Sequence, residues 1–392
     1  MAEQFTGNFT QQEALGEEEM AAALDVMRSG RLHRYNIAEG EIGEVAALEQ
    51  EYAAWQGAAY CLACASGGAA MQMALRAVGV EFGDFVLTNA FTLSPVPGAI
   101  VAAGGIPVLV ETTEGLVPNL DHLERIAVES GAKVMLLSLM RGHLPDMDAL
   151  MEITDRLGIA VIEDCAHSMG ATWRGKRSGS FGVAGCFSTQ TYKHLNSGEG
   201  GLLTSDDAEF MARATILSGS YMLYDRHVAG PSADAYSQAR LDMPNCSSRM
   251  DNLRAAILRP QLRRLDANVA RWAKRYAAVE AELRDVAGLT VIERPVDEVF
   301  VGSSIQFLRP EGSAQDFLRA CAARGVELKW FGASQAVGFT SSHHDWRSVP
   351  QQELPQTDAV LAGLFDMRLP LTFSVDDCRQ IGRIIRDCAL HG

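Results

Sequence analysis

Short apolar runs alternate with amphipathic stretches through the first half of the chain. An apolar run of this length between turn residues is typical of a buried strand, and three- and four-residue spacing is typical of a helix. The predicted strands are Ala59–Ala65, Phe85–Thr88, Pro107–Glu111, Val134–Leu139, a run ending at Asp164, and Val183–Phe187. The predicted helices are about Glu41–Gln56, Ala69–Val78, Leu120–Ser130 and Met147–Leu157. Strands that alternate with helices predict an α/β fold with a mainly parallel, mixed sheet flanked by helices.

The pattern changes in the second half of the chain. A helical pattern runs from Leu253 to Tyr276, and Pro260 within it predicts a kink. From about Leu289 short strands and helices follow one another, which indicates a smaller α+β C-terminal domain. A chain of 392 residues is long for one core. We therefore expect a large domain over residues 1–265, with an N-terminal helix at about 16–29, and a small domain over 266–392.

Composition narrows the class of partner. The net charge of −15 argues against nucleic acid and anionic membranes, since both require a basic face. The sequence contains no run of about 18 apolar residues, which a membrane-spanning helix would need. The first residues are acidic and polar, unlike a signal peptide. A cytoplasmic location is expected.

Metal or redox chemistry is not predicted. Among eight cysteines only Cys61 and Cys64 are closely spaced, and one such pair lies in an apolar run where buried thiols are common. The run His343-His344-Asp345 lacks ligand partners at a useful spacing and is predicted to be a surface loop.

Two charged residues follow predicted buried strands. Asp164 ends one strand, and Lys193 lies in the small-residue loop after the strand Val183–Phe187. Ligands bind at the carboxyl edge of an open α/β sheet. Taken singly, such a lysine is usually a solvated residue and such an aspartate a helix cap. Together they suit pyridoxal phosphate, for which a lysine forms the Schiff base and an aspartate holds the protonated pyridine nitrogen.

A phosphate site is predicted where the first strand meets its helix. Ser66-Gly67-Gly68 separates the strand from the helix, and a small-residue loop there presents free N–H groups at the positive end of the helix dipole. Alone, this signal usually marks a turn. Beside the lysine loop it becomes the candidate phosphate cup, formed by Gly67 and Gly68.

Longer motifs resemble one known family. The segments are LEQEYAAWQGAAYCLACASGGAAMQMALRAVG (48–79), EDCAHSMGA (163–171), GSFGVAGCFSTQTYK (179–193), SGEGG (197–201), SRMDNLRAAILRPQL (248–262) and RLPL (368–371). They resemble the DegT-like sugar and aminocyclitol aminotransferases, which are pyridoxal phosphate enzymes of fold type I. The SxQxxK…GEGG form is most similar to the branch that aminates keto-inositols.

The resemblance implies roles for individual residues. Lys193 would carry the Schiff base and, once released, act as general base, and Asp164 would hold the pyridine nitrogen. His167 stands where the family has Gln or His near the cofactor's 3-hydroxyl. Ser188 matches the family's phosphate-binding serine. Gln190 matches the subgroup's glutamine, for which the sequence gives no role.

Several positions depart from the family pattern. Gly68 stands where a threonine is common, so the backbone must supply more of the phosphate contacts. Where the family places an aromatic residue on the cofactor ring, the register gives Leu93, and either Leu93 or Phe91 covers the ring. An asparagine that binds phosphate across the dimer corresponds here to Ser247, with Asn245 two residues earlier, after an irregular excursion that begins at Tyr221.

The expected activity is amino transfer, with PLP and its pyridoxamine form (PMP) alternating. Glutamine or glutamate would donate to a keto group on a sugar, cyclitol or related polyhydroxylated compound, in a homodimer with shared active sites. Two alternatives stay open. One is a PLP-dependent dehydratase of the same family, although family dehydratases that use PMP replace the lysine with histidine. The other is a non-catalytic PLP-binding regulator.

Overall fold

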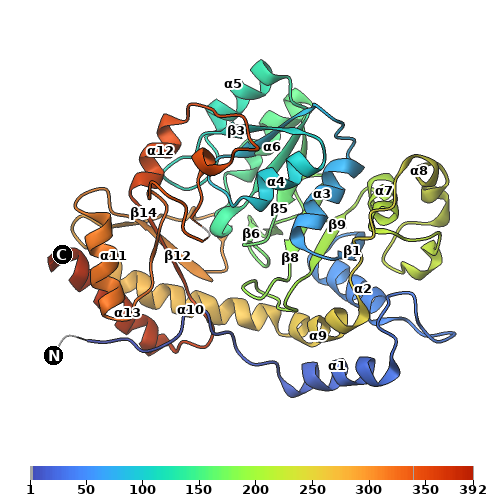
Figure 1. The fold of residues 1–392 in the computed structure, drawn as a ribbon, viewed down its shortest axis with the longest axis horizontal. Coiled ribbons are helices and arrows are strands. Elements are labelled where there is room, and N and C mark those ends of the chain that lie inside the picture. Colours follow the sequence, from blue (N-terminus) through green and yellow to red (C-terminus); the bar gives the residue numbers. More distant parts are fainter. Residues whose placement is uncertain (1–2, 339, 392) are drawn as a thin grey trace.

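The computed structural model describes residues 3–338 and 340–391, and its centre is a seven-stranded sheet (Figure 1). The strand order is β1-β9-β8-β5-β4-β2-β3. The strands are β1 (Tyr60–Cys64), β2 (Phe85–Asn89), β3 (Ile106–Val110), β4 (Val134–Ser138), β5 (Ala160–Asp164), β8 (Ala184–Ser188) and β9 (Gly201–Ser205). Only β9 runs against its neighbours, β1 and β8. The mainly parallel mixed sheet is therefore confirmed.

Helices cover both faces of this sheet. They are α2 (Glu44–Gln56), α3 (Gly67–Ala77), α4 (Pro95–Ala102), α5 (Leu120–Ser130), α6 (Met147–Leu157), α7 (Ala208–Ser218) and α9 (Asn252–Arg263). Along β1, Cys61 and Ala63 belong to the core beneath α2, α5, α6 and α9, whereas Leu62 and Cys64 belong to the core beneath α3, α4 and α7. The alternation of a strand thus divides its apolar residues between two cores.

The predicted long helix is two helices. α9 ends at Arg263 and α10 (Leu265–Leu283) follows, with Arg264 between them at φ −104° and ψ 0°. The interruption lies four residues beyond Pro260, which stays inside α9. The kink predicted at Pro260 stays a prediction, and the separation into two helices was not predicted. A proline removes one hydrogen bond from the helix without having to end it. Figure 1 shows α9 and α10 running end to end along the base of the molecule.

The C-terminal part forms its own sheet and core. The sheet order is β10-β12-β14-β13. Its strands are β10 (Thr290–Val291), β12 (Ser304–Leu308), β13 (Lys329–Trp330) and β14 (Leu364–Arg368), and its helices are α11 (Ala314–Ala323), α12 (Pro355–Ala362) and α13 (Val375–His391). Helices α10 and α13 pack together against β12 and β14. The division at residues 265 and 266 remains our proposal.

The remaining elements are short or lie at the N-terminus. Apart from short 3₁₀ turns, they are α1 (Glu17–Ser29), α8 (Tyr236–Asp242), and the small sheet of β11 (Glu298–Val299), β6 (Thr172–Trp173) and β7 (Lys176–Arg177). Helix α1 packs on α9. The excursion that begins at Tyr221 is less irregular than expected, because α8 lies within it.

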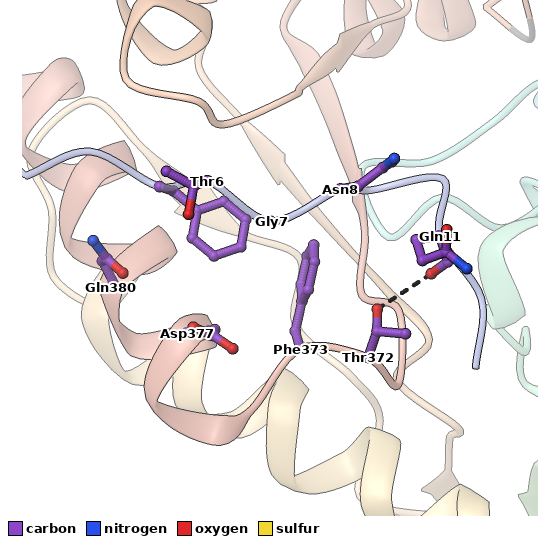
Figure 2. A pocket seen from close by; sticks show the side chains of 9 residues that line it. Thr6, Gly7, Asn8, Gln11, Thr372, Phe373, Asp377 and Gln380 are labelled. Atoms are coloured by element: carbon purple, nitrogen blue, oxygen red, sulfur yellow. Dashed lines mark hydrogen bonds between the residues drawn. The ribbon is translucent and has the colours of Figure 1, made fainter. Parts of the chain in front are cut away.

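The first residues of the chain lie against the C-terminal core. The rings of Phe5 and Phe9 meet the ring of Phe373 edge to face, with centroids 5.0 and 4.9 Å apart. Figure 2 shows a pocket between these first residues and the segment around Phe373. At this pocket the Thr372 hydroxyl donates to the carbonyl of Gln11 at 3.2 Å. In our proposed division these first residues pack with the small domain.

Two smaller expectations have different outcomes. Cys61 and Cys64 are buried free thiols, as predicted. His343 is buried rather than part of an exposed loop, because His343 and His344 each place Nε2 2.9 Å from Oδ1 of Asp358. Asp358 lies in α12, so a search for nearby ligands along the sequence missed it. Among the described residues, no helix combines the length and apolarity needed to cross a membrane.

Candidate active site

Asp164 is the last residue of β5 and is the carboxylate that remains available at this sheet edge. Its neighbour Glu163 points to the opposite face, because side chains alternate along a strand. Glu163 accepts three backbone N–H bonds from residues 179–182, at 2.7, 2.7 and 2.9 Å. Asp164 accepts the Ser138 hydroxyl on Oδ2 and the Ala166 N–H on Oδ1, each at 3.1 Å.

A chain of hydrogen bonds supports Asp164 from behind. The sheet register places Ser138, at the end of β4, beside Asp164. Thr92 donates its hydroxyl to Ser138 Oγ at 2.7 Å, and Asn89 Oδ1 accepts the Ser138 N–H at 2.9 Å. Burial raises the pKa of the Asp164 carboxyl, and the bonds that it accepts act in the opposite direction. The carboxylate is therefore oriented in advance of any ligand.

Lys193 lies on the loop after β8 and turns its amine toward His167. Its backbone N–H donates to the carbonyl of Gln190 at 2.8 Å, and Gln190 Oε1 accepts the N–H of Tyr192 at 3.0 Å. Lys193 Nζ lies 2.7 Å from His167 Nε2. Burial lowers the pKa of Lys193 to about 7, three nearby cations add to this effect, and Asp164 opposes it.

The two histidines near Lys193 are both neutral. Burial lowers the pKa of His167 well below its usual range, and the adjacent Lys193 adds to the effect. A neutral imidazole nitrogen can accept a hydrogen bond from the lysine amine. Burial lowers the pKa of His194 to about 3. His194 packs edge to face on Trp272 and lies 3.0 Å from the Ser303 hydroxyl, so its role is structural.

The loop before α3 forms a cup at the N-terminus of that helix. Ser66 Oγ caps the helix by accepting the N–H of Ala69 at 3.0 Å. Gly67 and Gly68 are the first two helical residues, whose N–H groups have no partner inside a helix. A Cβ on Gly67 would lie 2.9 Å from Ser188 Cβ. Glycine at this position therefore lets the serine and the helix terminus share one small space.

The glycine turn after Lys193 closes against this cup. A Cβ on Gly201 would lie 2.3 Å from the carbonyl oxygen of Ser66, so only glycine allows this approach. The hydroxyls of Thr189 and Ser197 lie 2.9 Å apart and join the two ends of the lysine loop. Glu199 is exposed at the turn.

Phe91 and Leu93 lie in different environments. Phe91 is 1% exposed and packs edge to face on Phe331, with ring centroids 5.2 Å apart. Leu93 is half-buried at the edge of the same cluster. The buried ring of Phe91 is occupied by its own packing, which favours Leu93 as the side chain that covers a ligand.

Asn245 and Ser247 lie together on an exposed turn. Asn245 Oδ1 accepts the Ser247 N–H at 3.1 Å, and Ser247 has a left-handed backbone, with φ of 51°. The carbonyl of Ser248, next along the chain, accepts the N–H of Ala65 at 2.9 Å. The turn thus lies beside the strand that leads into the cup, with both polar side chains accessible.

Three cationic side chains near Lys193 were absent from the sequence-based prediction. Arg141, Lys329 and Arg368 each lower the pKa of Lys193. Arg368 lies over the Tyr192 ring, 3.9 Å from its centroid.

The chain matches the model of the DegT/DnrJ/EryC1/StrS aminotransferase family over residues 13–386. It belongs to this family. The chain is similar to 3-amino-5-hydroxybenzoate synthase of Amycolatopsis mediterranei, with 32% identity over 81% of this chain and 82% of the relative. It is also similar to L-glutamine:2-deoxy-scyllo-inosose aminotransferase of Streptoalloteichus tenebrarius, with 32% identity over 62% and 57% of the two chains. The protein is therefore a PLP-dependent aminotransferase of the DegT-like family.

Solved structures agree on the fold. The structure of 3-amino-5-hydroxybenzoic acid synthase superimposes with a TM-score of 0.83 at 23% identity, covering 100% of both chains. That of GDP-4-keto-6-deoxymannose-3-dehydratase gives 0.82 at 18% identity, covering 97% of this chain and 100% of the other. The PLP fold type I architecture is confirmed, and at these identities the likeness concerns the fold alone.

The residues of this DegT-like aminotransferase fit the cofactor. The cup has free N–H groups and a serine hydroxyl for a phosphate, at a place where a side chain on Gly67 would fill the space. Asp164 offers a buried carboxylate for a protonated ring nitrogen, and Lys193 offers an amine whose pKa of about 7 leaves it reactive. The donor set thus has a suitable group for each end of the molecule.

Sequence analysis located the lysine and the aspartate but missed the groups around them. Ser138 could have been found, because it is a polar residue next to the end of the predicted strand Val134–Leu139, beside the strand of Asp164. Arg141, Lys329 and Arg368 come from three distant segments of the chain. Arg368 opens the RLPL motif quoted for the resemblance, but that motif gave it no role in the site.

Proposed function

We propose that this aminotransferase transfers an amino group from glutamine or glutamate to a keto group of a sugar, cyclitol or related polyhydroxylated compound. The observation that carries the proposal is the position of the Lys193 amine, 2.7 Å from a neutral His167 and with a pKa of about 7. Such an amine can both accept and release a proton near neutral pH, which amino transfer requires.

Each residue has a defined task in this proposal. Pyridoxal phosphate, when bound, supplies the electron-withdrawing ring on which amino groups are exchanged. Asp164 holds the proton on the ring nitrogen, and Ser138 orients Asp164. Ser188 and the N–H groups at the start of α3 bind the phosphate. Lys193 Nζ accepts and returns the proton at the reacting carbon of the substrate, while His167 Nε2 orients the amine.

We also propose a homodimer, on the basis of an exposed apolar stripe on α1 and the exposed turn that holds Asn245 and Ser247. Met20, Leu24 and Met27 lie at helical spacing on α1, with exposed fractions of 42, 45 and 60%. An apolar stripe of this kind supports a homodimer, as expected for the family. The accessible turn with Asn245 and Ser247 would then reach the phosphate cup of the second subunit.

A cytoplasmic location is also proposed. All eight cysteines carry free thiols, and seven of them are buried. Free thiols of this number are typical of a reducing compartment. Cell fractionation, with a known cytoplasmic protein as reference, would test the location.

The experiment that tests the activity follows one half-reaction at a time. Purified protein is loaded with PLP, and its visible absorption is recorded as glutamine, glutamate or alanine is added. We expect one donor to bleach the visible band and leave the absorption of pyridoxamine phosphate, and Lys193→Ala to show no such change. A band that no donor bleaches would contradict amino transfer and favour elimination chemistry.

A further inference from the structure

Two adjacent histidines and an aspartate converge on one point in the C-terminal part. His343 and His344 lie in the 3₁₀ turn His343–Asp345, and Asp358 lies in α12. Nε2 of each imidazole lies 2.9 Å from the same atom, Oδ1 of Asp358, and the three atoms all lie within 4.8 Å of one another. Within residues 3–338 and 340–391, no other three side chains of this kind lie so close. Imidazole nitrogens and a carboxylate oxygen are ligands that Zn²⁺ takes from proteins.

The backbone of a 3₁₀ turn does not by itself bring two adjacent side chains to one atom. Successive residues of a 3₁₀ helix point about 120° apart, yet the rings of His343 and His344 have centroids 3.8 Å apart and planes at 40°. A capping box fixes the turn. Asp345 Oδ2 accepts the N–H of Ser342 at 2.8 Å, and the Ser342 side chain accepts the N–H of Asp345. The turn therefore holds both imidazoles in place before any ion binds.

Hydrogen bonding alone compensates poorly for the burial of His343. Its side chain is 1% exposed, and its Nδ1 is buried and has no hydrogen-bond partner among the described residues. The remaining nitrogen, Nε2, shares one oxygen of Asp358 with His344. Burial of a polar group costs free energy unless a strong interaction replaces its bonds to water. A bond from Nε2 to a metal ion would compensate for this cost better than the shared hydrogen bond.

The dimensions of the cluster suit a tetrahedral ion. With bonds of ~2.0–2.2 Å, two ligand atoms on Zn²⁺ lie about 3.4 Å apart, so each of the two N···O distances would widen by about half an ångström. The side chains of His344 and Asp358 are 58 and 43% exposed, so both are free to make this adjustment. They also leave the cluster open to solvent on one side. An ion can enter there, and a water molecule can complete its coordination.

An ion at this point would join two elements that already contact the edge of the main sheet. The carboxylate of Glu111, the residue after β3, accepts two N–H groups from the first turn of α12, at 3.2 and 2.7 Å. The segment before α12 follows β3, the edge strand, because Gln352 Oε1 accepts the N–H of Leu109 at 3.1 Å. Trp346 belongs to the same small core as Leu109. A metal ion between the turn and α12 would therefore fix residues 340–354 along the sheet edge.

We propose that His343, His344 and Asp358 bind a divalent transition metal ion of the Zn²⁺ type, and that this ion fixes residues 340–354 against α12 and the edge of the main sheet. The role of the ion is structural. The site uses none of the residues proposed to hold the cofactor or to move a proton, so the inference does not depend on the proposed amino transfer.

The first measurement is calorimetry with Zn²⁺ on the PLP-loaded protein, freed of metal by a chelator and carrying no affinity tag. We expect one Zn²⁺ per chain and no comparable binding of Mg²⁺, which prefers oxygen ligands. Asp358→Asn keeps an oxygen that can accept from both imidazoles but removes the charge. Loss even of a group that only supports a metal ligand weakens binding by about 10- to 100-fold, so Asp358→Asn and His344→Gln should each cost at least this much. His33→Gln, which changes an exposed histidine outside the cluster, is the matched control and should bind like the wild type.

The second measurement is hydrogen exchange, which locates the effect of the ion in the chain. In the wild type, Zn²⁺ should slow the exchange of the N–H groups of Asp345 and Trp346, which close the 3₁₀ turn. The N–H groups of α5 should exchange at the same rate with and without Zn²⁺. In Asp358→Asn, Zn²⁺ should change neither segment, because the ion no longer joins the turn to α12.

Two results would overturn the proposal. One is a wild-type protein that binds Zn²⁺ no more tightly than Mg²⁺, which would leave the cluster as a hydrogen-bonded contact only. The other is Zn²⁺ binding that Asp358→Asn and His344→Gln leave unchanged, which would assign the ion to another group, such as the exposed thiol of Cys246. Neither measurement needs turnover. A failure of the proposed amino transfer would be seen separately, as a band that no donor bleaches.

Discussion

Lys193 Nζ lies 2.7 Å from His167 Nε2, and both groups are buried enough to lose charge near neutral pH. Burial lowers the pKa of the lysine from 10.5 to about 7 and that of the histidine well below 6.5. An amine that is about half neutral near pH 7 and an imidazole that is neutral can share a hydrogen bond without placing two positive charges in one small space. The lowered pKa that makes the Lys193 amine reactive should therefore also make the free energy of unfolding depend on pH.

The first prediction concerns the stability of the cofactor-free protein as pH changes. Between pH about 7 and 10.5 the unfolded chain holds a proton on Lys193 that the folded chain lacks. The free energy of unfolding should therefore rise through this window, by roughly a few kcal/mol in total from this group. Urea denaturation at several pH values measures the rise.

The matching variant for this measurement is Lys193→Met. The variant should be more stable than the wild type at pH 7, and the two curves should converge toward pH 10.5. Lys329, whose pKa is lowered to about 8, titrates in the same window in both proteins, so only the difference between them reports on Lys193. A difference that stays constant from pH 7 to 10 would contradict the lowered pKa.

The second prediction concerns the support of Asp164. Ser138→Ala removes the hydroxyl that Asp164 Oδ2 accepts at 3.1 Å, and the pKa of the carboxyl should rise because a bond to its charged form is lost. We expect turnover to fall about tenfold, whereas Asp164→Asn, which removes the charge, should lower it by a further ~10-fold or more. Steady-state rates at pH 7.5 provide the comparison.

If Ser138 acts by orienting Asp164, its removal should also change the pH dependence of the rate. The acid limb of the pH–rate profile should move to higher pH in Ser138→Ala, since the carboxyl protonates more readily. Thr92→Val is the control, because Thr92 touches the Ser138 hydroxyl and not the carboxylate. An unchanged acid limb in Ser138→Ala would refute the positioning role.

The parts of the fold that sequence analysis found are those with a strong local signal. Helices α5 and α6 have the predicted bounds, because capping residues and apolar spacing agree at both ends. The separation of α9 from α10 at Arg264 was not predicted, because the apolar spacing continues through it and neither glycine nor proline stands at that position. Local rules therefore locate elements better than they locate the points where two helices separate.

The residues of the candidate site differ in the same way: some have a local sequence signal and others have none. Asp164 ends β5 and Lys193 lies on the loop after the neighbouring strand β8, so the topology of the sheet brings them to the same edge. Arg141 could not be inferred, because its position depends on a left-handed turn held by Arg294 from a segment more than a hundred residues later. Contacts between segments far apart in the sequence determine the positions of such residues, and these contacts leave no periodic pattern in the sequence.

The third prediction concerns the glycine of the phosphate cup. In Gly67→Ala the added methyl would lie 2.9 Å from Ser188 Cβ, so the cup must open and its contacts to a phosphate weaken. We expect the dissociation constant for PLP to rise by about tenfold, measured by visible absorbance during titration. Gly98→Ala, in α4, is the matched control, because a Cβ there meets nothing within 4 Å. Equal PLP affinity in the two variants would contradict the proposed cup.

The fourth prediction tests the homodimer and its shared sites. Leu24 is 45% exposed at the centre of the apolar stripe on α1, and Leu24→Glu would place a charge in the proposed interface. Light scattering after size exclusion should show two chains for the wild type and one chain for the variant at low micromolar concentration. Because the partner's turn is proposed to reach the phosphate cup, the one-chain form should also bind PLP more weakly. Val128→Glu, on an exposed apolar residue of α5, is the control for surface charge. A wild-type protein that is already one chain and binds PLP fully would reject both the dimer and the trans contact.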